Sequence, residues 1–167
     1  MKKCICITLA CLIVLFCCAC QKKSAQPLGT VTVYYKAAEL TFGSAEGVIV
    51  PYMLEADGHQ NDVEYLLNAY LSAAPSGNFA DTFPAGTYLV SLSLDALTAK
   101  VVLCDKFAKL SGLDLTIACV SLTQTVISLT DCQEVIISAE TARLDGNNFI
   151  TLNQDSYLLL DESGDAD

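Results

Sequence analysis

Alternation of apolar and polar residues is clearest in the middle of the chain, between residues 83 and 107. A turn signal at Pro84 and Gly86 precedes a run with the two-residue period of a half-buried strand. The apolar face of this hairpin would carry Tyr88, Val90, Leu92 and Leu94, continued on a returning strand by Ala99, Val101 and Leu103. The sequence therefore predicts a β-hairpin, whose turn at residues 95–98 contains neither Gly nor Asn.

A helical period precedes this hairpin. Apolar residues recur at intervals of three and four between residues 63 and 74, which is the spacing of one helix face. We expect Asn61 to cap this helix, with Glu64 completing a capping-box-like arrangement, and residues 75–77 to end it. The stripe that would pack on a sheet consists of Val63, Leu66, Leu67, Tyr70, Leu71 and Ala74.

A second helix is predicted from Asp114, as its cap, to about Leu129. Many residues in this segment are β-branched, which favours a strand, but sixteen residues without a turn signal are too many for one. We also expect Asp105 to cap a short turn through residues 107–110. The predicted apolar stripe of the long helix consists of Leu115, Ala118, Cys119, Leu122, Val126 and Leu129.

Shorter strand patterns lie on both sides of these elements. They occupy residues 30–35, 48–50, 133–138, 149–152 and 157–160, and we expect Pro51 to stop the second of them. The predicted fold class is α+β, with a mixed, mostly antiparallel sheet and two helices packed on one face. Residues 161–167 are predicted to form an acidic disordered tail.

The first residues have the pattern of an export signal. A basic start precedes an apolar run at residues 5–19, which is shorter than the ~20 residues that a membrane-spanning helix needs. Ala19 before Cys20 resembles the cleavage site of bacterial lipoprotein signal peptides, in which the cysteine is lipidated. We therefore expect a signal peptide at residues 1–19, a lipidated Cys20 with a tether at residues 20–29, and one folded domain at residues 30–160. An uncleaved anchor or ordinary secretion is the alternative.

The charge balance disfavours binding to polyanions. The chain has 9 basic and 19 acidic residues, and without the signal peptide seven basic residues remain, which gives a net charge of −12. Nucleic acid would repel such a domain. Lys22 and Lys23 are the exception, because beside a lipidated Cys20 they could contact anionic headgroups.

Three cysteines remain in the predicted domain, Cys104, Cys119 and Cys132. Their spacing contains no Cys-x-x-Cys pair, so a metal-finger interpretation is poor. One disulfide would leave an odd cysteine, and the sequence cannot say which two would pair. We favour three small, free and mostly buried thiols.

Candidate metal ligands surround the only histidine. Asp57, His59 and Asp62 have suitable side chains, but a turn at Asp57 followed by a cap at Asn61 or Asp62 explains the same residues without an ion. We expect no metal and no other cofactor.

The enzyme alternative is a cell-wall hydrolase. It would draw its acid and base from Asp57, Asp62, Asp81 and Asp95, yet these residues are scattered over loops and polar edges. Serine chemistry also lacks support, because the chain has no Gly-x-Ser-x-Gly motif. We therefore predict no catalytic residues and no enzymatic activity.

Four segments together resemble the GerMN domain, also called the sporulation and spore germination domain. They are TVTVYY, VEYLLNAYLSAAP, FPAGTYLVSLSLDALTAKVVLCDKF and LTIACVSLTQTVISLTDCQEVIIS, and the resemblance covers residues 30–142. Cys104 departs from it where the family usually has a helix-capping Ser, and Leu97 replaces a glycine at the hairpin. The resemblance implies an α/β fold similar to ring-building motifs, assembly with protein partners outside the membrane, and a role in sporulation or germination.

These observations predict a lipid-anchored protein on the extracytoplasmic face of the cell membrane, acting as a non-catalytic protein-interaction module. Its expected partners are envelope or sporulation proteins, with peptidoglycan as a further candidate. The alternative is a general envelope lipoprotein that binds a small ligand or peptidoglycan. Candidate contact aromatics are Tyr34, Tyr52, Tyr65 and Tyr88, which are equally compatible with ordinary packing.

Overall fold

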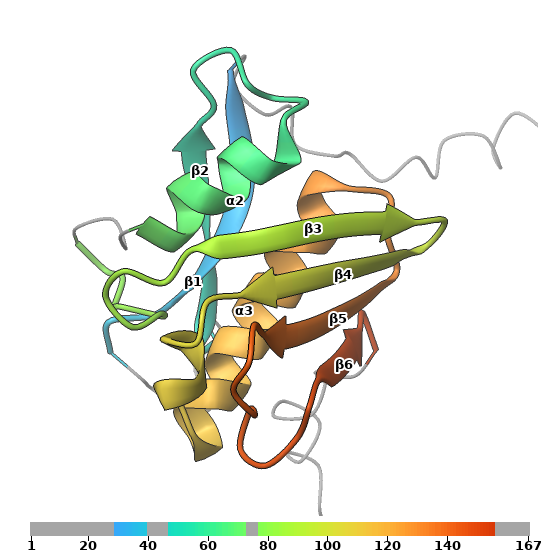
Figure 1. The fold of residues 1–167 in the computed structure, drawn as a ribbon. Coiled ribbons are helices and arrows are strands. Elements are labelled where there is room, and N and C mark those ends of the chain that lie inside the picture. The colour runs from blue at the N-terminus through green and yellow to red at the C-terminus, as the bar shows by residue number, and fades with distance from the viewer. Residues whose placement is uncertain (1–28, 40–46, 73–76, 156–167) are drawn as a thin grey trace, which may run out of the picture.

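The computed structural model describes residues 29–39, 47–72 and 77–155. Figure 1 shows its helices and strands. The elements are β1 (Thr30–Lys36), β2 (Ile49–Glu55), α2 (Val63–Ser72), β3 (Leu89–Asp95), β4 (Thr98–Leu103), the short helix η1 (Phe107–Lys109), α3 (Gly112–Leu129), β5 (Glu134–Ala139) and β6 (Ile150–Asn153). The predicted strand at residues 157–160 and the acidic tail lie outside the described residues, as do the predicted signal peptide, Cys20 and most of the tether.

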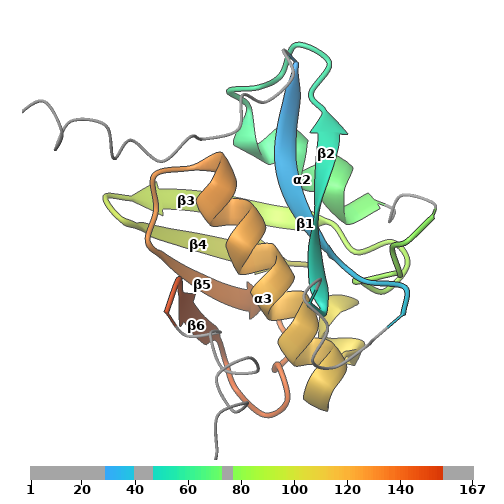
Figure 2. The ribbon, with the colours of Figure 1, turned by 180° about the vertical axis from the view of Figure 1, so that it is seen from behind.

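The strands form two sheets, and helix α3 contacts both of them. Strands β1 and β2 form an antiparallel pair, and the other sheet has the order β3-β4-β5-β6, in which only β4 and β5 run parallel. Figure 2 shows α3 lying across the back of the four-stranded sheet, with β1 and β2 beside it. The α+β class and the mixed, mostly antiparallel pairing are confirmed, whereas the expectation of a single sheet is wrong.

Helix α3 replaces a third strand beside β1, which explains the second sheet. The Tyr34 N–H donates to Thr125 Oγ1 at 2.9 Å, and Ser128 Oγ donates to the Thr32 carbonyl at 2.6 Å. Side-chain hydroxyls of a helix thus satisfy backbone groups that a neighbouring strand would otherwise pair. The β1–β2 pair therefore ends at the helix and does not join the larger sheet.

Helix α3 begins two residues earlier than predicted, at Gly112, and ends at Leu129 as expected. Ser111 precedes it, so the prediction that Asp114 is the cap is wrong; Asp114 forms an ion pair with Lys36 instead, at 2.8 Å. The helix is long and apolar enough to span a membrane, but 56% of it is buried inside the domain. Burial between two layers offsets the weak helix propensity of its β-branched residues.

Helix α2 begins at Val63, and its cap is Asp62 rather than Asn61. The carboxylate of Asp62 accepts a hydrogen bond from the Tyr65 N–H at 3.0 Å, which satisfies one free donor of the first turn. The predicted stripe is confirmed where the structure describes it, since Leu66, Leu67, Tyr70 and Leu71 are buried. Asp57 and Gly58 form the preceding turn, both with positive φ.

The central hairpin is confirmed, with one change of face. Ala99, Val101 and Leu103 of β4 are fully buried, and Leu92 pairs with Val101 as predicted, whereas Leu94, which pairs with Ala99, is 51% exposed. A bulge between Leu89 and Ser91 shifts the register, so that Leu89 opposes Leu103. The prediction that Tyr88 and Val90 lie on the buried face is therefore wrong, because this extra residue turns the beginning of β3 over.

Strand β2 continues past the proline that was expected to stop it. Pro51 lies opposite Tyr34, and pairing extends from Ile49 to Glu55. Because β2 is an edge strand with β1 on one side only, the missing N–H of Pro51 can face away from β1 without breaking the pairing. The remaining strands agree with prediction to within one residue at each end.

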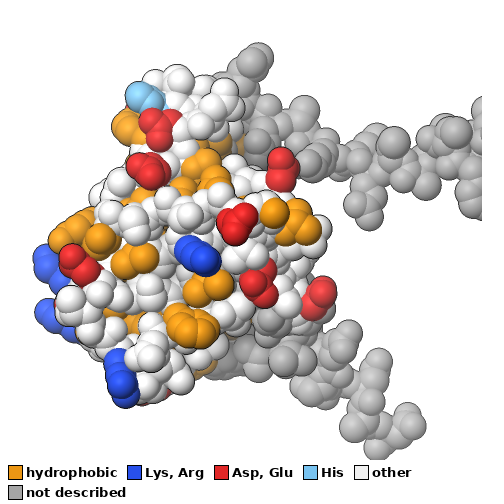
Figure 3. Space-filling view, turned by 45° about the vertical axis from the view of Figure 1, so that its right-hand side comes forward, with side chains coloured by type: hydrophobic (Ala, Val, Ile, Leu, Met, Phe, Trp, Pro, Cys, Tyr) orange, Lys and Arg blue, Asp and Glu red, His pale blue; other side chains and the backbone are white. Residues whose placement is uncertain are grey.

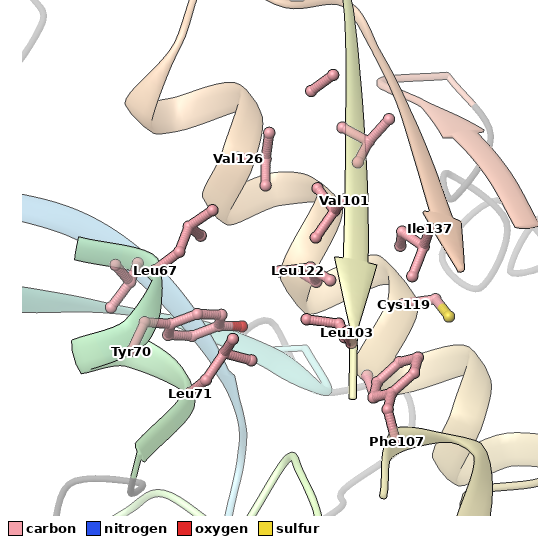
Figure 4. Packing of buried hydrophobic residues seen from close by; sticks show 14 of the residues in the cluster. Leu67, Tyr70, Leu71, Val101, Leu103, Phe107, Cys119, Leu122, Val126 and Ile137 are labelled. Atoms are coloured by element: carbon pink, nitrogen blue, oxygen red, sulfur yellow. The ribbon is translucent and has the colours of Figure 1, made fainter. Parts of the chain in front are cut away.

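One hydrophobic core fills the space between the layers. Figure 4 shows side chains of α2, α3, β4 and β5 meeting there, with Leu122 and Val126 of α3 beside Val101 of β4. Two buried tyrosines connect α2 to β1 by hydrogen bonds. Tyr35 Oη donates to the Tyr70 carbonyl at 2.9 Å, and Tyr70 Oη donates to the Tyr34 carbonyl at 2.6 Å. Both phenol groups are therefore satisfied inside the core.

Candidate functional site

The four-stranded sheet has an outer face that no described helix or strand covers (Figures 1 and 2). On β4 and β5 alternate residues are buried against α3, so the residues between them point outward. The outer positions in the middle of the sheet are mostly small and polar, with two aliphatic side chains. They are Ser91, Ser93, Lys100, Val102, Ile136, Ser138 and Thr151.

Large hydrophobic side chains gather at one end of this outer face. Tyr88 is 52% exposed and Phe149 is 57% exposed, and Val90 lies beside Tyr88 at the bulge. Tyr88 precedes β3 and Phe149 precedes β6, and both strands begin next to the ends of β4 and β5. The antiparallel register therefore brings these two aromatic residues, which are 61 positions apart in sequence, to the same end of the sheet.

The two ends of the sheet differ in charge, because the charged residues at one end are all acidic, whereas the other end carries basic residues as well. Where β4 and β5 begin, the carboxylates are those of Asp95, Asp131, Glu134 and Asp155, with no lysine or arginine among them. Where β4 and β5 end, the following loops carry three basic residues, Lys106, Lys109 and Arg143, together with three acidic ones, Asp105, Glu140 and Asp145. In Figure 3, Lys and Arg side chains lie mostly along the left-hand side and Asp and Glu side chains mostly on the right, although acidic side chains also occur on the left and a basic one lies near the centre.

Asp105 holds together the two loops at the basic end. Its carboxylate accepts hydrogen bonds from the N–H groups of Thr141 and Ala142, at 2.8 and 3.0 Å, and a short one from the Thr141 hydroxyl. These bonds stabilise the charged form and hold the pKa of Asp105 below its usual range. The prediction that Asp105 caps the next turn is wrong, because η1 has no side-chain cap and Asp105 reaches across to the β5–β6 loop instead.

The remaining carboxylates at this end leave the cations unpaired. Asp145 Oδ2 accepts a hydrogen bond from the Gly112 N–H at 3.4 Å, and Asp105 is occupied as described. Glu140, which directly follows β5, forms no ion pair with another described residue. Within residues 29–39, 47–72 and 77–155, neither lysine of the β4–α3 loop forms an ion pair, and Arg143 forms none. These three cations are therefore available to a negatively charged group.

The predicted metal ligands lie at the start of α2, away from the outer face. His59 Nδ1 lies 3.8 Å from Asp62 Oδ2, and its ring stacks on Tyr65 with 3.9 Å between ring centroids. Asp57 forms the turn and Asp62 caps the helix, which are the structural roles that the sequence allowed for them. The described residues contain no group of three or more ligands that could hold a metal ion.

The four carboxylates considered for hydrolysis are not brought together in a cleft. Asp81 lines a hollow of about 120 Å³ beside Phe83 and Leu71, and it is the only one of the four there. A larger, half-open hollow of about 370 Å³ lies at the acidic end of the sheet, where Glu134 and Asp155 contribute the carboxylates among amide side chains. Neither hollow contains two of the residues that the enzyme alternative requires.

The candidate contact aromatics divide into two pairs. Tyr88 and Tyr65 are exposed, whereas Tyr34 and Tyr52 are partly buried, the latter packed edge-on against Phe79 with 5.3 Å between ring centroids. Only Tyr88 lies on the outer face. Phe149 was not predicted as a contact residue, although its position after the turn at residues 145–148 and before a strand was visible in the sequence.

The three cysteines of the domain are free and buried, as favoured from the sequence. Cys119 lies in the core on α3, and burial raises the pKa of its thiol to about 12. A thiol with so high a pKa is a packing residue, because the reactive species is the thiolate.

Comparison with known proteins finds relatives in structure only. No family model matches the sequence, and no curated protein matches it. A Clostridium perfringens protein provisionally described as a lipoprotein is similar, with a TM-score of 0.48 and 13% identity over 78% of this chain and 92% of that one. The tandem GerMN domains of the sporulation protein GerM from Bacillus subtilis have a TM-score of 0.48 and 17% identity, over 78% of this chain and 48% of theirs.

The first GerMN domain of the same Bacillus subtilis protein is also similar. Its TM-score is 0.46 and its identity 18%, over 71% of this chain and 92% of that domain. The GerMN domains that the sequence resembles are thus among the structural neighbours of this chain.

Proposed function

We propose that this protein is an extracytoplasmic lipoprotein, held to the membrane through Cys20, whose GerMN-like domain binds other proteins and performs no catalysis. The observation that carries the proposal is the uncovered outer face of the β3–β6 sheet. A sheet normally buries one face and leaves the other polar, so large hydrophobic side chains on the open face call for a partner. Tyr88 and Phe149, each more than half exposed, are such side chains.

The composition of this face is typical of a protein interface. Its exposed aromatic side chains lie at one end, small hydroxyl residues such as Ser91 and Ser138 lie along its middle, and charged groups form a rim. Interfaces favour aromatic anchors surrounded by polar residues, and a surface of small side chains allows close approach of a partner. The hollow of about 370 Å³ at the acidic end of this face is open to solvent and has a mostly polar lining, whereas small-molecule sites are mostly enclosed and apolar.

The tether has a physical role in this proposal. Acylation at Cys20 would confine the domain near the membrane, and a linker of about nine residues would limit its distance to roughly 30 Å. Confinement raises the effective concentration of the outer face near envelope partners. A partner could then be bound through an interface of modest affinity.

The tether is tested by replacing the cysteine. The variant Cys20→Ala should no longer incorporate a labelled fatty acid and should leave the membrane fraction, while a neighbouring Cys18→Ala change should have neither effect. Labelling that persists in Cys20→Ala would contradict the lipoprotein proposal.

We also propose that the partners belong to spore formation or germination, as the sequence resemblance implies. The test is crosslinking of a tagged copy in vegetative and in starved, spore-forming cultures, followed by mass spectrometry. Sporulation proteins recovered only from the second culture would support the assignment. The same envelope partners in both cultures would point to a general envelope role.

A further inference from the structure

We propose that two copies of this chain join through the free edge of strand β3, in an antiparallel pairing centred on Ser93. Strand β3 is the outermost strand of the four-stranded sheet, with β4 on one side and no described strand on the other. The four-stranded sheets of the two copies would then form one continuous sheet, and their outer faces would lie side by side. This self-association goes beyond the proposed function and does not depend on it.

The geometry of the hairpin determines which backbone groups of β3 point to its free edge. Asp95 pairs with Thr98 across a two-residue turn, and the pair that closes such a turn exchanges hydrogen bonds. Bonded and non-bonded pairs alternate from there, so Ser93 also bonds to β4, whereas Leu92 and Leu94 do not. The N–H and C=O groups of these two leucines therefore point away from β4, and no described residue bonds to them.

The hydrogen bonds on the far side of β4 agree with this alternation. The carbonyls of Leu97 and Leu103 accept hydrogen bonds from the N–H groups of Glu134 and Glu140, on the side of β5. Odd-numbered positions along β4 thus face β5, which leaves the even-numbered ones to bond to β3. The free edge of β3 is therefore a row of unpaired donors and acceptors, which is the template that another strand needs.

The other strand edges in the described part of the chain are protected, and this one is not. Hydroxyl groups of α3 bond to the edge of β1, Pro51 interrupts the edge of β2, and β6 is only four residues long. At the start of β3 the Asn68 side chain accepts the Leu89 N–H at 3.2 Å, so helix α2 covers that part of the edge. Figure 1 shows β3 continuing past α2 towards its turn. Residues 91–95 contain neither Pro nor Lys, which commonly block edge pairing.

The order of the side chains on the inner face selects a second copy as the occupant. In the register centred on Ser93, Leu92 of each copy lies opposite Leu94 of the other, and both pairs would exchange backbone hydrogen bonds. Leu94 pairs with the buried Ala99 and thus lies on the inner face of the sheet, yet it is 51% exposed. Leu92 of the second copy would cover this exposed leucine.

The side chains on the outer face are also compatible with this register. Ser93 would lie opposite its own copy, and Ser91 opposite Asp95, whose carboxylate can accept a hydrogen bond from the serine hydroxyl. The two Asp95 carboxylates would be separated along the strands by about 13 Å, which exceeds the Debye length of about 8 Å at physiological salt. The negative charge of the chain therefore does not oppose pairing at this edge.

Cysteine substitution tests the register. Directly opposed residues have Cβ atoms about 5 Å apart, which a small adjustment brings within reach of a disulfide. In the purified full chain in lipid vesicles, oxidised with copper phenanthroline, Ser93→Cys should form several-fold more disulfide-linked dimer than the unmodified protein. The matched change Ser91→Cys should form no more than the unmodified protein, because its two copies would lie about 13 Å apart. A mixture of the Ser91→Cys and Asp95→Cys proteins should form a mixed dimer, although neither variant dimerises alone.

A second pair of changes tests the leucine contacts. Added to Ser93→Cys, Leu94→Lys should reduce the dimer to the level of the unmodified protein, whereas Leu113→Lys on α3 should leave it unchanged. The two leucines are 51% and 53% exposed, so both variants should keep the circular dichroism spectrum of the folded protein. Dimer that survives Leu94→Lys would overturn the proposal.

Two further outcomes would also overturn it. One is a Ser93→Cys dimer no more abundant than that of the unmodified protein, and the other is equal dimer from Ser91→Cys and Ser93→Cys, which would indicate random collision. The experiment involves no partner protein, so either outcome would leave the proposed function untouched.

Discussion

The hydroxyl of Thr125 is the most informative single group to remove, because it joins helix α3 to strand β1. The side chain is fully buried, and its oxygen accepts the Tyr34 N–H at 2.9 Å. The phenol of Tyr70 lies nearby and donates to the Tyr34 carbonyl at 2.6 Å. Thr125→Val keeps the shape of the side chain and removes only the hydrogen bond.

We expect Thr125→Val to lower the free energy of unfolding by about 2 kcal/mol, since a buried N–H left without an acceptor costs roughly 1–3 kcal/mol. For a domain of this size that corresponds to a decrease in Tm of roughly 5–10 °C. The control Thr125→Ser keeps the hydroxyl and loses one methyl group, at a cost of about 1 kcal/mol. Urea unfolding of the two variants, followed by circular dichroism, measures both values.

The relative stability of the two variants shows whether Thr125 acts through its hydrogen bond or through packing. If the hydroxyl holds β1 to α3, the valine variant is the less stable of the two. If Thr125 acts only by filling space, the valine variant is as stable as the unmodified protein and the serine variant is the weaker. The second order would refute the view that α3 replaces a strand beside β1.

Three further predictions concern Leu122, Asp105 and Cys119. Leu122→Ala, at a fully buried position of α3, should cost about 2–5 kcal/mol in chemical denaturation, and a loss below 1 kcal/mol would mean that the two layers are loosely packed. Asp105→Asn should lower Tm at pH 7. Because the folded-state pKa of Asp105 is lowered, the stabilisation by its carboxylate should be lost as the pH falls through that lowered pKa, so the Tm difference between the variant and the unmodified protein should shrink. A Tm difference that is independent of pH would contradict this. Cys119, whose thiol pKa is raised to about 12, should resist iodoacetamide at pH 8 in the folded protein and react after unfolding, and rapid labelling of the folded protein would disprove its burial.

Much of the fold follows from local patterns in the sequence. The spacing of Leu66, Tyr70 and Leu71 determined helix α2, and the alternation of Ala99, Val101 and Leu103 determined β4. Each of these elements buries only one face, so its apolar residues recur in the sequence with a period of 3.6 in the helix and 2 in the strand. Helix α3 was harder to predict, because its buried residues lie on several faces and its β-branched residues are typical of a strand.

The errors arose where tertiary contacts overrule local signals. Asp105 and Asp114 both looked like helix caps, but each bonds to a residue far away in the sequence, Thr141 and Lys36 respectively. The division into two sheets depends on hydrogen bonds from Thr125 and Ser128 to β1, which no periodicity reveals. These contacts join positions 36 to 96 residues apart, and sequence spacing carries no record of them.

The candidate surface was only partly predictable. Tyr88 was recognised as an exposed aromatic candidate, yet the pattern also placed it on the buried face, because the bulge at Val90 has no Gly to mark it. Phe149 became a partner of Tyr88 only through the strand order β3-β4-β5-β6. A parallel pair between two antiparallel ones cannot be derived from the individual strands, so the surface required the structure.

Site-specific photocrosslinking in cells tests the central claim most directly. A photoreactive amino acid at position 149 would report on the outer face, and the same amino acid at position 53, on the exposed side of β2, would serve as the control. Our account predicts a discrete protein adduct from position 149 that disappears when Ile136→Asp is added, and no such adduct from position 53. Equal adducts from both positions, or adducts unchanged by Ile136→Asp, would contradict the view that the outer face of this sheet is the binding surface.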